Sequence, residues 1–323
     1  MTPAPDDDLP DYADVARAVG VVRPFVRPTP LYEWPELGAA LGCRFLLKHE
    51  NHAPTGAFKV RGGVNLLHHL SAEERGRGLI ACTTGNHGQS LAYACRLFGV
   101  RCVLVVPQGN NPDKGRAMRG WGAELIEHGA DYDEARERCE VLARREGLRY
   151  VHSANEPHLI AGVGTYAMEI FDDCPTPDIL IVPIGLGSGI CGAGLTASER
   201  SPRTRVIGVQ AEQAPAVALS WRRGQPVTTA SAVTFAEGIA TRTPADMTLR
   251  LMRRLVHDIV LVSETSLREA VLAVLRATHN LAEGAGAASV AAAFGIRDQL
   301  AGKTVVGVLS GGNLDLRCLR EML

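Results

Sequence analysis

Residues 181–192 have the sequence Ile-Val-Pro-Ile-Gly-Leu-Gly-Ser-Gly-Ile-Cys-Gly, which predicts a buried strand, a glycine-rich turn and then a helix. Backbone amides that are not crowded by Cβ atoms form an anion-binding concavity, so this turn is typical of a phosphate site. The pattern does not say what carries the phosphate. Gly187, Gly189 and Gly192 also match the dinucleotide fingerprint, and Glu212 follows near the end of the next predicted strand.

The rest of the chain alternates short β-branched runs with longer helical patterns, which predicts an α/β protein with a largely parallel sheet. We expect strands at 43–48, 79–83, 102–106, 124–128, 179–182, 206–209, 259–262 and 305–309. We expect helices at 57–70, 88–97, 131–145, 156–171, 266–279 and 285–300. Four strand–helix units follow one another in residues 76–150. We interpret this segment as a small domain, and residues 1–75 and 151–323 as a large domain.

Composition narrows the class of protein. Among the 323 residues, 46% are apolar and 21% are charged, which excludes global disorder. A net charge of −1 with 5% aromatic residues favours neither nucleic acid nor an anionic membrane as a partner. The first ten residues are acidic and lack an apolar run, so we expect no signal peptide. The eight cysteines form no C-x-x-C pair, and we interpret them as reduced thiols of a cytoplasmic protein.

Lysine is rare, because only four of the 34 basic residues are lysines. Lys59 follows Pro-Thr-Gly-Ala-Phe at a predicted helix start, where the helix dipole and desolvation both disfavour its ammonium form. A neutral amine is what a Schiff-base lysine requires. Lys48 ends a strand beside two ionisable residues, and we interpret it as an ion-pairing residue. Lys114 and Lys303 lie in polar turns, which predicts solvated surface lysines.

Two more loops follow predicted strands. Residues 83–90 read Thr-Thr-Gly-Asn-His-Gly-Gln-Ser, and their amides could hold a carboxylate while Asn86 bonds a ring hydroxyl. Helix capping by Thr84 or Asn86 is the simpler alternative. Residues 310–313 read Ser-Gly-Gly-Asn, and Ser310 could offer its hydroxyl to a heteroaromatic nitrogen. A tight turn before the last helix would explain the same four residues.

Together, the four motifs resemble those of the fold-type II pyridoxal-phosphate enzymes, in order and in spacing. Within that family, the chain resembles the threonine dehydratase and serine racemase group from about Pro28 to Asn313. The resemblance also includes residues 164–169, 236–240 and 282–287. It implies two domains of the tryptophan synthase β type, with parallel-rich sheets and helices on both faces. It further implies pyridoxal 5′-phosphate as the cofactor, an amino acid as the small-molecule substrate, and a homodimer.

The resemblance also implies a role for each site residue. Lys59 would form the Schiff base with the cofactor and would remove the substrate α-proton. The other cofactor contacts would be Phe58 beside the ring, Asn86 at the ring hydroxyl, Ser310 at the pyridine nitrogen, and Gly185, Leu186, Gly187, Ser188 and Gly189 around the phosphate. The substrate carboxylate would be held by Thr84, Gly85, Asn86 and His87.

The chain departs from the family pattern in several places, and Leu186 and Ser188 interrupt the run of glycines that the family often has in the phosphate loop. Thr84 stands where related enzymes usually have Ser or Ala, and its bulkier, more restrained hydroxyl disfavours efficient racemisation. Gln210 and Ala216 stand where metal-binding members would have acids, so we predict no essential metal there.

These observations favour β-elimination from L-threonine or L-serine, which gives a 2-oxo acid and ammonia. Alternatives with the same cofactor are serine racemase, threonine synthase, or a dehydratase for a bulkier 3-hydroxy amino acid such as hydroxyaspartate or phenylserine. An NAD-dependent dehydrogenase built on Gly187–Gly192 is an alternative of a different class, but it leaves the loops of Lys59, Asn86 and Ser310 unexplained. A non-catalytic metabolite-binding protein would have no need for Lys59.

Overall fold

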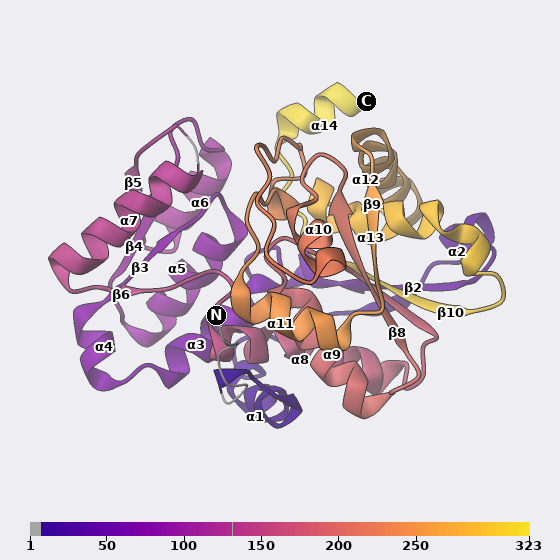
Figure 1. Cartoon of the computed structure of the whole chain (residues 1–323), viewed down its shortest axis with the longest axis horizontal. Helices are drawn as coiled ribbons and strands as arrows, with labels where there is room; N and C mark the ends of the chain where they lie inside the picture. The colour runs from indigo at the N-terminus through magenta and orange to yellow at the C-terminus, as the bar shows by residue number, and fades with distance from the viewer. Residues whose placement is uncertain (1–7, 131) are drawn as a thin grey trace.

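The computed structural model describes residues 8–130 and 132–323. The predicted helix start at residue 131, and most of the N-terminal stretch used to predict the absence of a signal peptide, lie outside these residues. Figure 1 shows two sheets with their own helices, the smaller in the magenta segment and the larger in the orange, yellow and indigo segments. No helix in the described part of the chain is long and apolar enough to span a membrane.

The larger sheet has six strands in the order β1-β2-β10-β7-β8-β9. Their bounds are Leu31–Glu33 for β1, Arg44–His49 for β2, Thr304–Leu309 for β10, Ile179–Pro183 for β7, Arg205–Ala211 for β8 and Asp258–Val262 for β9. Only β1 is antiparallel to its neighbour. The central strands of this sheet, such as β7 and β10, are mostly apolar along their whole length. This is usual for parallel strands, because helices cover both faces of the sheet.

Helices cover both faces of this sheet. Along β7, Leu180 and Val182 pack into one core with α8 (Pro157–Asp173), α9 (Ser188–Arg200) and α11 (Asp246–Leu255). Ile179 and Ile181 alternate with them and pack into a second core with α2 (Pro35–Leu41), α12 (Glu264–Thr278) and α13 (Gly284–Gly295). The two-sided arrangement confirms the predicted fold class.

The smaller sheet has four parallel strands in the order β5-β4-β3-β6. Their bounds are Glu124–Glu127, Cys102–Val106, Leu79–Cys82 and Arg149–Tyr150, respectively. Helices α5 (Asn86–Phe98) and α6 (Pro112–Gly120) lie on one face, and α7 (Tyr132–Glu146) lies on the other. These strands fall within residues 76–150, and the division of the chain into two domains stays a prediction.

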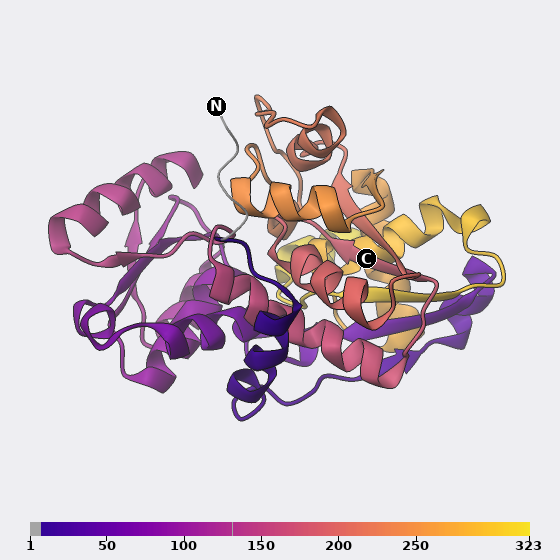
Figure 2. The same ribbon diagram turned by 60° about the horizontal axis from the view of Figure 1, so that its bottom comes forward.

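Helix α3 (Lys59–His69) lies between the two sheets and packs against both α5 and α8. Two adjacent glycines permit this close packing. A Cβ on Gly62 would lie 2.7 Å from the carbonyl oxygen of Leu159, and a Cβ on Gly63 would lie 2.7 Å from the carbonyl oxygen of Ser90. Helix α1 (Tyr12–Val22) packs beside α8 and α3, as Figure 2 shows.

All eight predicted strands and all six predicted helices are present, with shifted ends. The predicted helix 285–300 is too long, because α13 ends at Gly295 and a 3₁₀ turn follows at Arg297–Gln299. The prediction missed β1, β6, α1, α2, α6 and α11 together with α4 (Ala72–Arg77) and α10 (Ala216–Arg223). The remaining elements are α14 (Leu316–Met322) and the 3₁₀ turns η2 (Glu50–His52) and η3 (Glu237–Ile239).

Candidate active site

The four loops singled out by sequence follow the carboxyl ends of β2, β3, β7 and β10 and meet between the two sheets. The loops after β2 and β10 pair directly through a short antiparallel bridge between Ala57 and Gly311. Beside it, the amide of Phe58 donates to the carbonyl oxygen of Ser310 at 3.1 Å. This pairing fixes the start of α3 relative to Ser310.

Lys59 is the first residue of α3 and lies at the junction, by which we mean the place where the four loops meet. Its Nζ donates to Ser188 Oγ at 2.7 Å, so the loops after β2 and β7 meet at the amine. The residue is half-buried, yet the protein around its amine desolvates it and lowers the pKa of Lys59 to about 8. No charged group among the described residues offsets that effect. A substantial fraction of this amine is therefore neutral near pH 8, as a nucleophile requires.

The phosphate loop, residues 185–189, leads into the N-terminus of α9. Gly187 is the N-cap residue with φ of +102°, a conformation that favours glycine, and no side chain caps the helix there. A Cβ on Gly185 would lie 2.5 Å from the carbonyl oxygen of Gly238, and one on Gly189 would lie 3.2 Å from the ring of Phe58. The first amides of α9 are thus left for an anion.

The carboxylate loop, residues 84–87, leads into α5, which begins at Asn86. The hydroxyl of Thr83 accepts from the amides of Gly85 at 3.1 Å and Gly88 at 3.0 Å. Thr83 therefore does the capping that the sequence suggested for Thr84 or Asn86. Burial and the charge of Lys59 lower the pKa of His87 to about 3, so its ring is neutral at working pH.

Asn86 and Ser310 lie at the junction as the sequence suggested. The amide nitrogen of Asn86 donates to Glu283 at 2.5 Å, and its oxygen accepts from Asn313 at 2.8 Å. Ser310 is buried, and its hydroxyl donates to the carbonyl oxygen of Ala285 at 3.3 Å. Sequence reasoning missed Glu283, although the segment 282–287 was among the matching motifs.

The prediction that Lys114 is a solvated surface lysine is wrong. Its side chain is 8% exposed, and its Nζ contacts Glu237 at 2.5 Å and Glu283 at 3.7 Å. Both carboxylates come from the part of the chain that forms the larger sheet, far away in sequence. A polar turn therefore gave no sign of the burial that tertiary contacts impose.

The prediction that Lys48 is an ion-pairing residue is confirmed. Lys48 Nζ lies 2.5 Å from Glu169, which also binds Arg61 at 2.7 Å. Arg61 in turn binds Glu50 at 2.8 Å. All four side chains are buried, so this chain of ion pairs anchors α3 at Arg61, two residues beyond Lys59.

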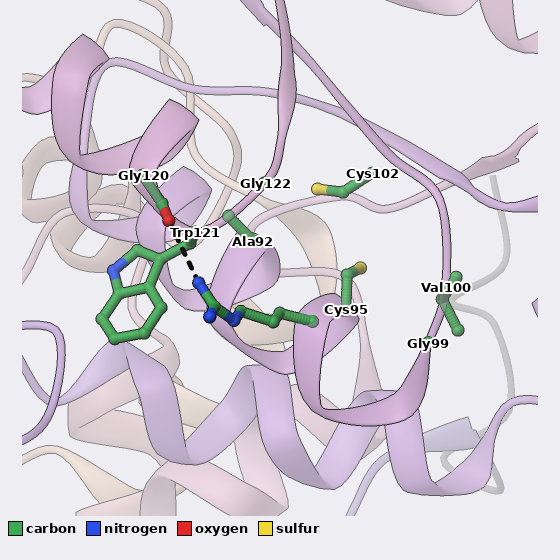
Figure 3. Close-up of a pocket in the computed structure, with 9 residues that line it drawn as sticks. Ala92, Cys95, Gly99, Val100, Cys102, Gly120, Trp121 and Gly122 are labelled. Atoms are coloured by element: carbon green, nitrogen blue, oxygen red, sulfur yellow. Dashed lines mark hydrogen bonds between the residues drawn. The ribbon is translucent and has the colours of Figure 1, made fainter.

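A cavity of about 280 Å³ lies apart from these loops, beside α5, β4 and the end of α6 (Figure 3). Its lining residues are Ala92, Cys95, Arg96, Gly99, Val100, Cys102, Gly120, Trp121 and Gly122. None of the four loops contributes to it, so it is not part of the candidate active site.

Comparison with known proteins agrees with the geometry of these loops. The family model described as pyridoxal-phosphate dependent enzyme matches residues 22–311, and the chain belongs to this family. Its cofactor is therefore pyridoxal phosphate, and the dehydrogenase reading of Gly187–Gly192 is wrong. The predicted likeness to the threonine dehydratase and serine racemase group is confirmed by individual relatives.

The chain is 37% identical to an L-threonine ammonia-lyase of Thermotoga maritima over 310 residues, which cover 96% of this chain and 77% of the relative. Among solved structures, maize serine racemase matches with a TM-score of 0.92 at 27% identity and covers 97% of this chain and 96% of its own. The processed form of threonine deaminase isoform 2 from Solanum lycopersicum matches with a TM-score of 0.90 at 27% identity and covers 98% of this chain and 94% of its own.

The residues at the junction fit this cofactor. Uncapped amides at the start of α9 suit a phosphate, and the crowding around Gly185 and Gly189 leaves backbone rather than side chains to line that loop. The desolvated amine of Lys59, with its lowered pKa, suits bond formation with an aldehyde carbon.

Proposed function

We propose that this enzyme removes water and then ammonia from L-threonine or L-serine. The names of the relatives support the reaction, and the Lys59 amine is the observation in the site that carries the proposal. The substrate α-proton and β-hydroxyl leave as water. The resulting unsaturated amine hydrolyses to a 2-oxo acid and ammonia.

Lys59 holds the cofactor and takes the α-proton, and the carboxylate loop binds the substrate carboxylate at the N-terminus of α5. The remaining cofactor contacts are Phe58, Asn86, Ser310 and the phosphate loop from Gly185 through Leu186, Gly187 and Ser188 to Gly189. When bound, the cofactor supplies the electron sink for the bond broken at the substrate α-carbon.

Ser310 favours elimination in this proposal. Ser310 offers a hydroxyl rather than a carboxylate to a pyridine nitrogen, so it would not fix a proton there, and the bound cofactor would be a weaker electron sink. Prompt expulsion of a β-hydroxyl is then favoured over slow return of the α-proton. In the structure, the Ser310 hydroxyl donates to the Ala285 carbonyl oxygen at 3.3 Å, a long hydrogen bond that a better acceptor can replace.

The near-ultraviolet and visible absorbance of the purified enzyme, followed while L-threonine and then L-serine are added, tests the proposal together with a 2-oxo acid assay. We expect an absorbance band that shifts on mixing and a 2-oxo acid that accumulates. Lys59→Ala should lose both the band and the turnover, whereas Lys303→Ala, on the partly exposed lysine, should keep both. Turnover by Lys59→Ala contradicts the proposal. A shifted band without product moves the reaction to another class, and chiral analysis then detects racemisation.

We also propose an oligomeric state, a cellular location and an independence from metal ions for this enzyme. A homodimer rests on the family resemblance and is tested by light scattering. A cytoplasmic location is supported by eight free cysteines. Independence from a divalent cation at the loop after β8 is supported by Gln210, whose buried amide accepts from Ala218 at 2.8 Å and contacts the Ile184 carbonyl at 3.5 Å. Undiminished turnover in EDTA is the expected result.

A further inference from the structure

The tripeptide Ala-Glu-Gly occurs at 236–238 and again at 282–284, and its two glutamates face the same lysine. Lys114 Nζ lies 2.5 Å from Glu237 and 3.7 Å from Glu283. Lys114 belongs to α6 of the smaller sheet, whereas Glu237 lies in η3 and Glu283 is the N-cap residue of α13. The contacts therefore span the two halves of the molecule.

The stem of Lys114 lies directly on the carboxylate loop. A Cβ on Gly85 would be 2.6 Å from Lys114 Cδ, so only a glycine there lets the lysine lie so close. The backbone of Lys114 is fixed at the start of α6, because the side chain of Asn111 caps the helix by accepting from the amides of Asp113 and Lys114. The stem of Lys114 is therefore packed against Gly85 from a fixed position at the start of α6.

The other end of the contact lies on the phosphate loop. Glu237 precedes Gly238, whose carbonyl oxygen would lie 2.5 Å from a Cβ on Gly185. Lys114 thus touches the carboxylate loop with its stem, and with its ammonium it holds the segment that packs on the phosphate loop. Glu283 joins them, because it also accepts from Asn86 at 2.5 Å.

Charge keeps this arrangement intact. Burial would lower the pKa of Lys114, but Glu283 and Glu237 outweigh that effect and raise the pKa, so the ammonium persists. The Lys114 side chain is 8% exposed and that of Glu237 is 44% exposed. The Lys114–Glu237 bond is therefore more open to replacement by water than the contact of Lys114 with Glu283, whose side chain is 7% exposed.

We propose that Lys114 and Glu237 are positioning residues that form a clasp, which holds the carboxylate loop closed against the substrate. This inference rests on the proposed function, because it assigns substrate binding to residues 84–87. Neither residue of the clasp is required to bind the cofactor or to move a proton. Opening the clasp should therefore weaken the binding of the amino acid more than it slows the chemical step.

Glu237→Gln tests the clasp in the holoenzyme, because it removes the charge and preserves the shape. We expect KM for the amino acid to rise about tenfold, kcat to change less than about threefold, and the cofactor absorbance to stay intact. Glu237→Asp should recover part of the KM. Arg101→Met, which breaks an exposed ion pair with Glu124 within the smaller sheet, is the matched control and should leave KM unchanged.

Hydrogen exchange in the absence of substrate gives a readout that does not depend on turnover. Amides of residues 83–88 should exchange faster in Glu237→Gln than in the wild type or in Arg101→Met. If the wild type turns over neither threonine nor serine, the proposed function fails and this comparison alone decides the clasp. Unchanged exchange at 83–88, an unchanged KM, or loss of the cofactor together with the rise in KM overturns the clasp.

Discussion

Lys59 and Lys114 carry the same type of side chain, but their surroundings shift its pKa in opposite directions. Both lysines lie beside the four loops, but Lys59 meets two uncharged partners, the hydroxyl of Ser188 and the ring of Phe58, whereas Lys114 meets two carboxylates. Burial lowers the pKa of Lys59 to about 8, and for Lys114 the carboxylates outweigh burial and raise the pKa. The comparison teaches that the absence of a charged partner, rather than burial alone, makes a lysine available as a neutral amine.

Replacing each lysine with arginine should separate the two roles most strongly. Arginine stays protonated in proteins, so Lys59→Arg should lower kcat/KM by about 10³-fold or more. Lys114→Arg keeps the cation beside Glu237 and should stay within about tenfold of the wild type. Steady-state kinetics with L-threonine measure both variants. Equal losses in the two variants would remove the distinction between them.

A third lysine, Lys48, extends the comparison to stability. It shares Glu169 with Arg61, so Arg61→Met leaves the Glu50 carboxylate buried without its cation while Glu169 keeps Lys48. Urea unfolding should show a loss of about 3–5 kcal/mol in the free energy of unfolding. Arg101→Met, at an exposed pair, should cost less than about 1 kcal/mol. A loss that small in Arg61→Met would contradict the structural role of this network.

The pH dependence of cofactor capture should report the lowered pKa of Lys59. Because the amine is neutral above its pKa of about 8, the rate at which the apoenzyme captures pyridoxal phosphate should rise about tenfold per pH unit below pH 8 and then level off. Stopped-flow absorbance gives the rate. For Nα-acetyl-lysine, whose side-chain amine has an ordinary pKa, the rate of reaction with pyridoxal phosphate should keep rising beyond pH 8. A profile for the apoenzyme that follows the model amine would argue against a desolvated Lys59.

Ser188→Ala should have the smallest effect. Its hydroxyl is neutral and burial causes the shift, so removing the bond at 2.7 Å should change the capture rate at pH 8 less than about threefold. Affinity for inorganic phosphate, measured on the apoenzyme by calorimetry, should fall modestly because one donor is lost. A large change in the pH profile of capture would mean that Ser188, rather than burial, sets the pKa.

Much of the architecture could be predicted because its signals are local. Buried parallel strands are continuous apolar runs, and a glycine turn marks the start of α9. The edge strands β1 and β6 have only three and two residues, which is too short for a pattern to show. Helix α11 carries four charged residues in a ten-residue segment, so its apolar face was not recognised.

The residues of the candidate site also fall into those with a local sequence signal and those that only folding brings together. Lys59, Asn86 and Ser310 follow strands within recognisable motifs, so the sequence could indicate them. Glu237 lies 123 residues from Lys114, and only folding brings the two together. The charge state of a buried side chain depends on such distant partners, which is why the sequence suggested a surface position for Lys114.

The different roles of Lys59 and Lys114 depend most directly on the protonation of their amines. The chain has four lysines, so ¹³C-methylene NMR of the apoenzyme, with lysine labelled at Cε, can follow each one during a pH titration. Loss of a signal in Lys59→Arg and in Lys114→Arg assigns the two that matter. We predict that Lys59 titrates near pH 8 while Lys114 stays charged beyond the ordinary lysine range. A Lys59 that titrates with an ordinary pKa, or a Lys114 that loses its proton first, would contradict the account.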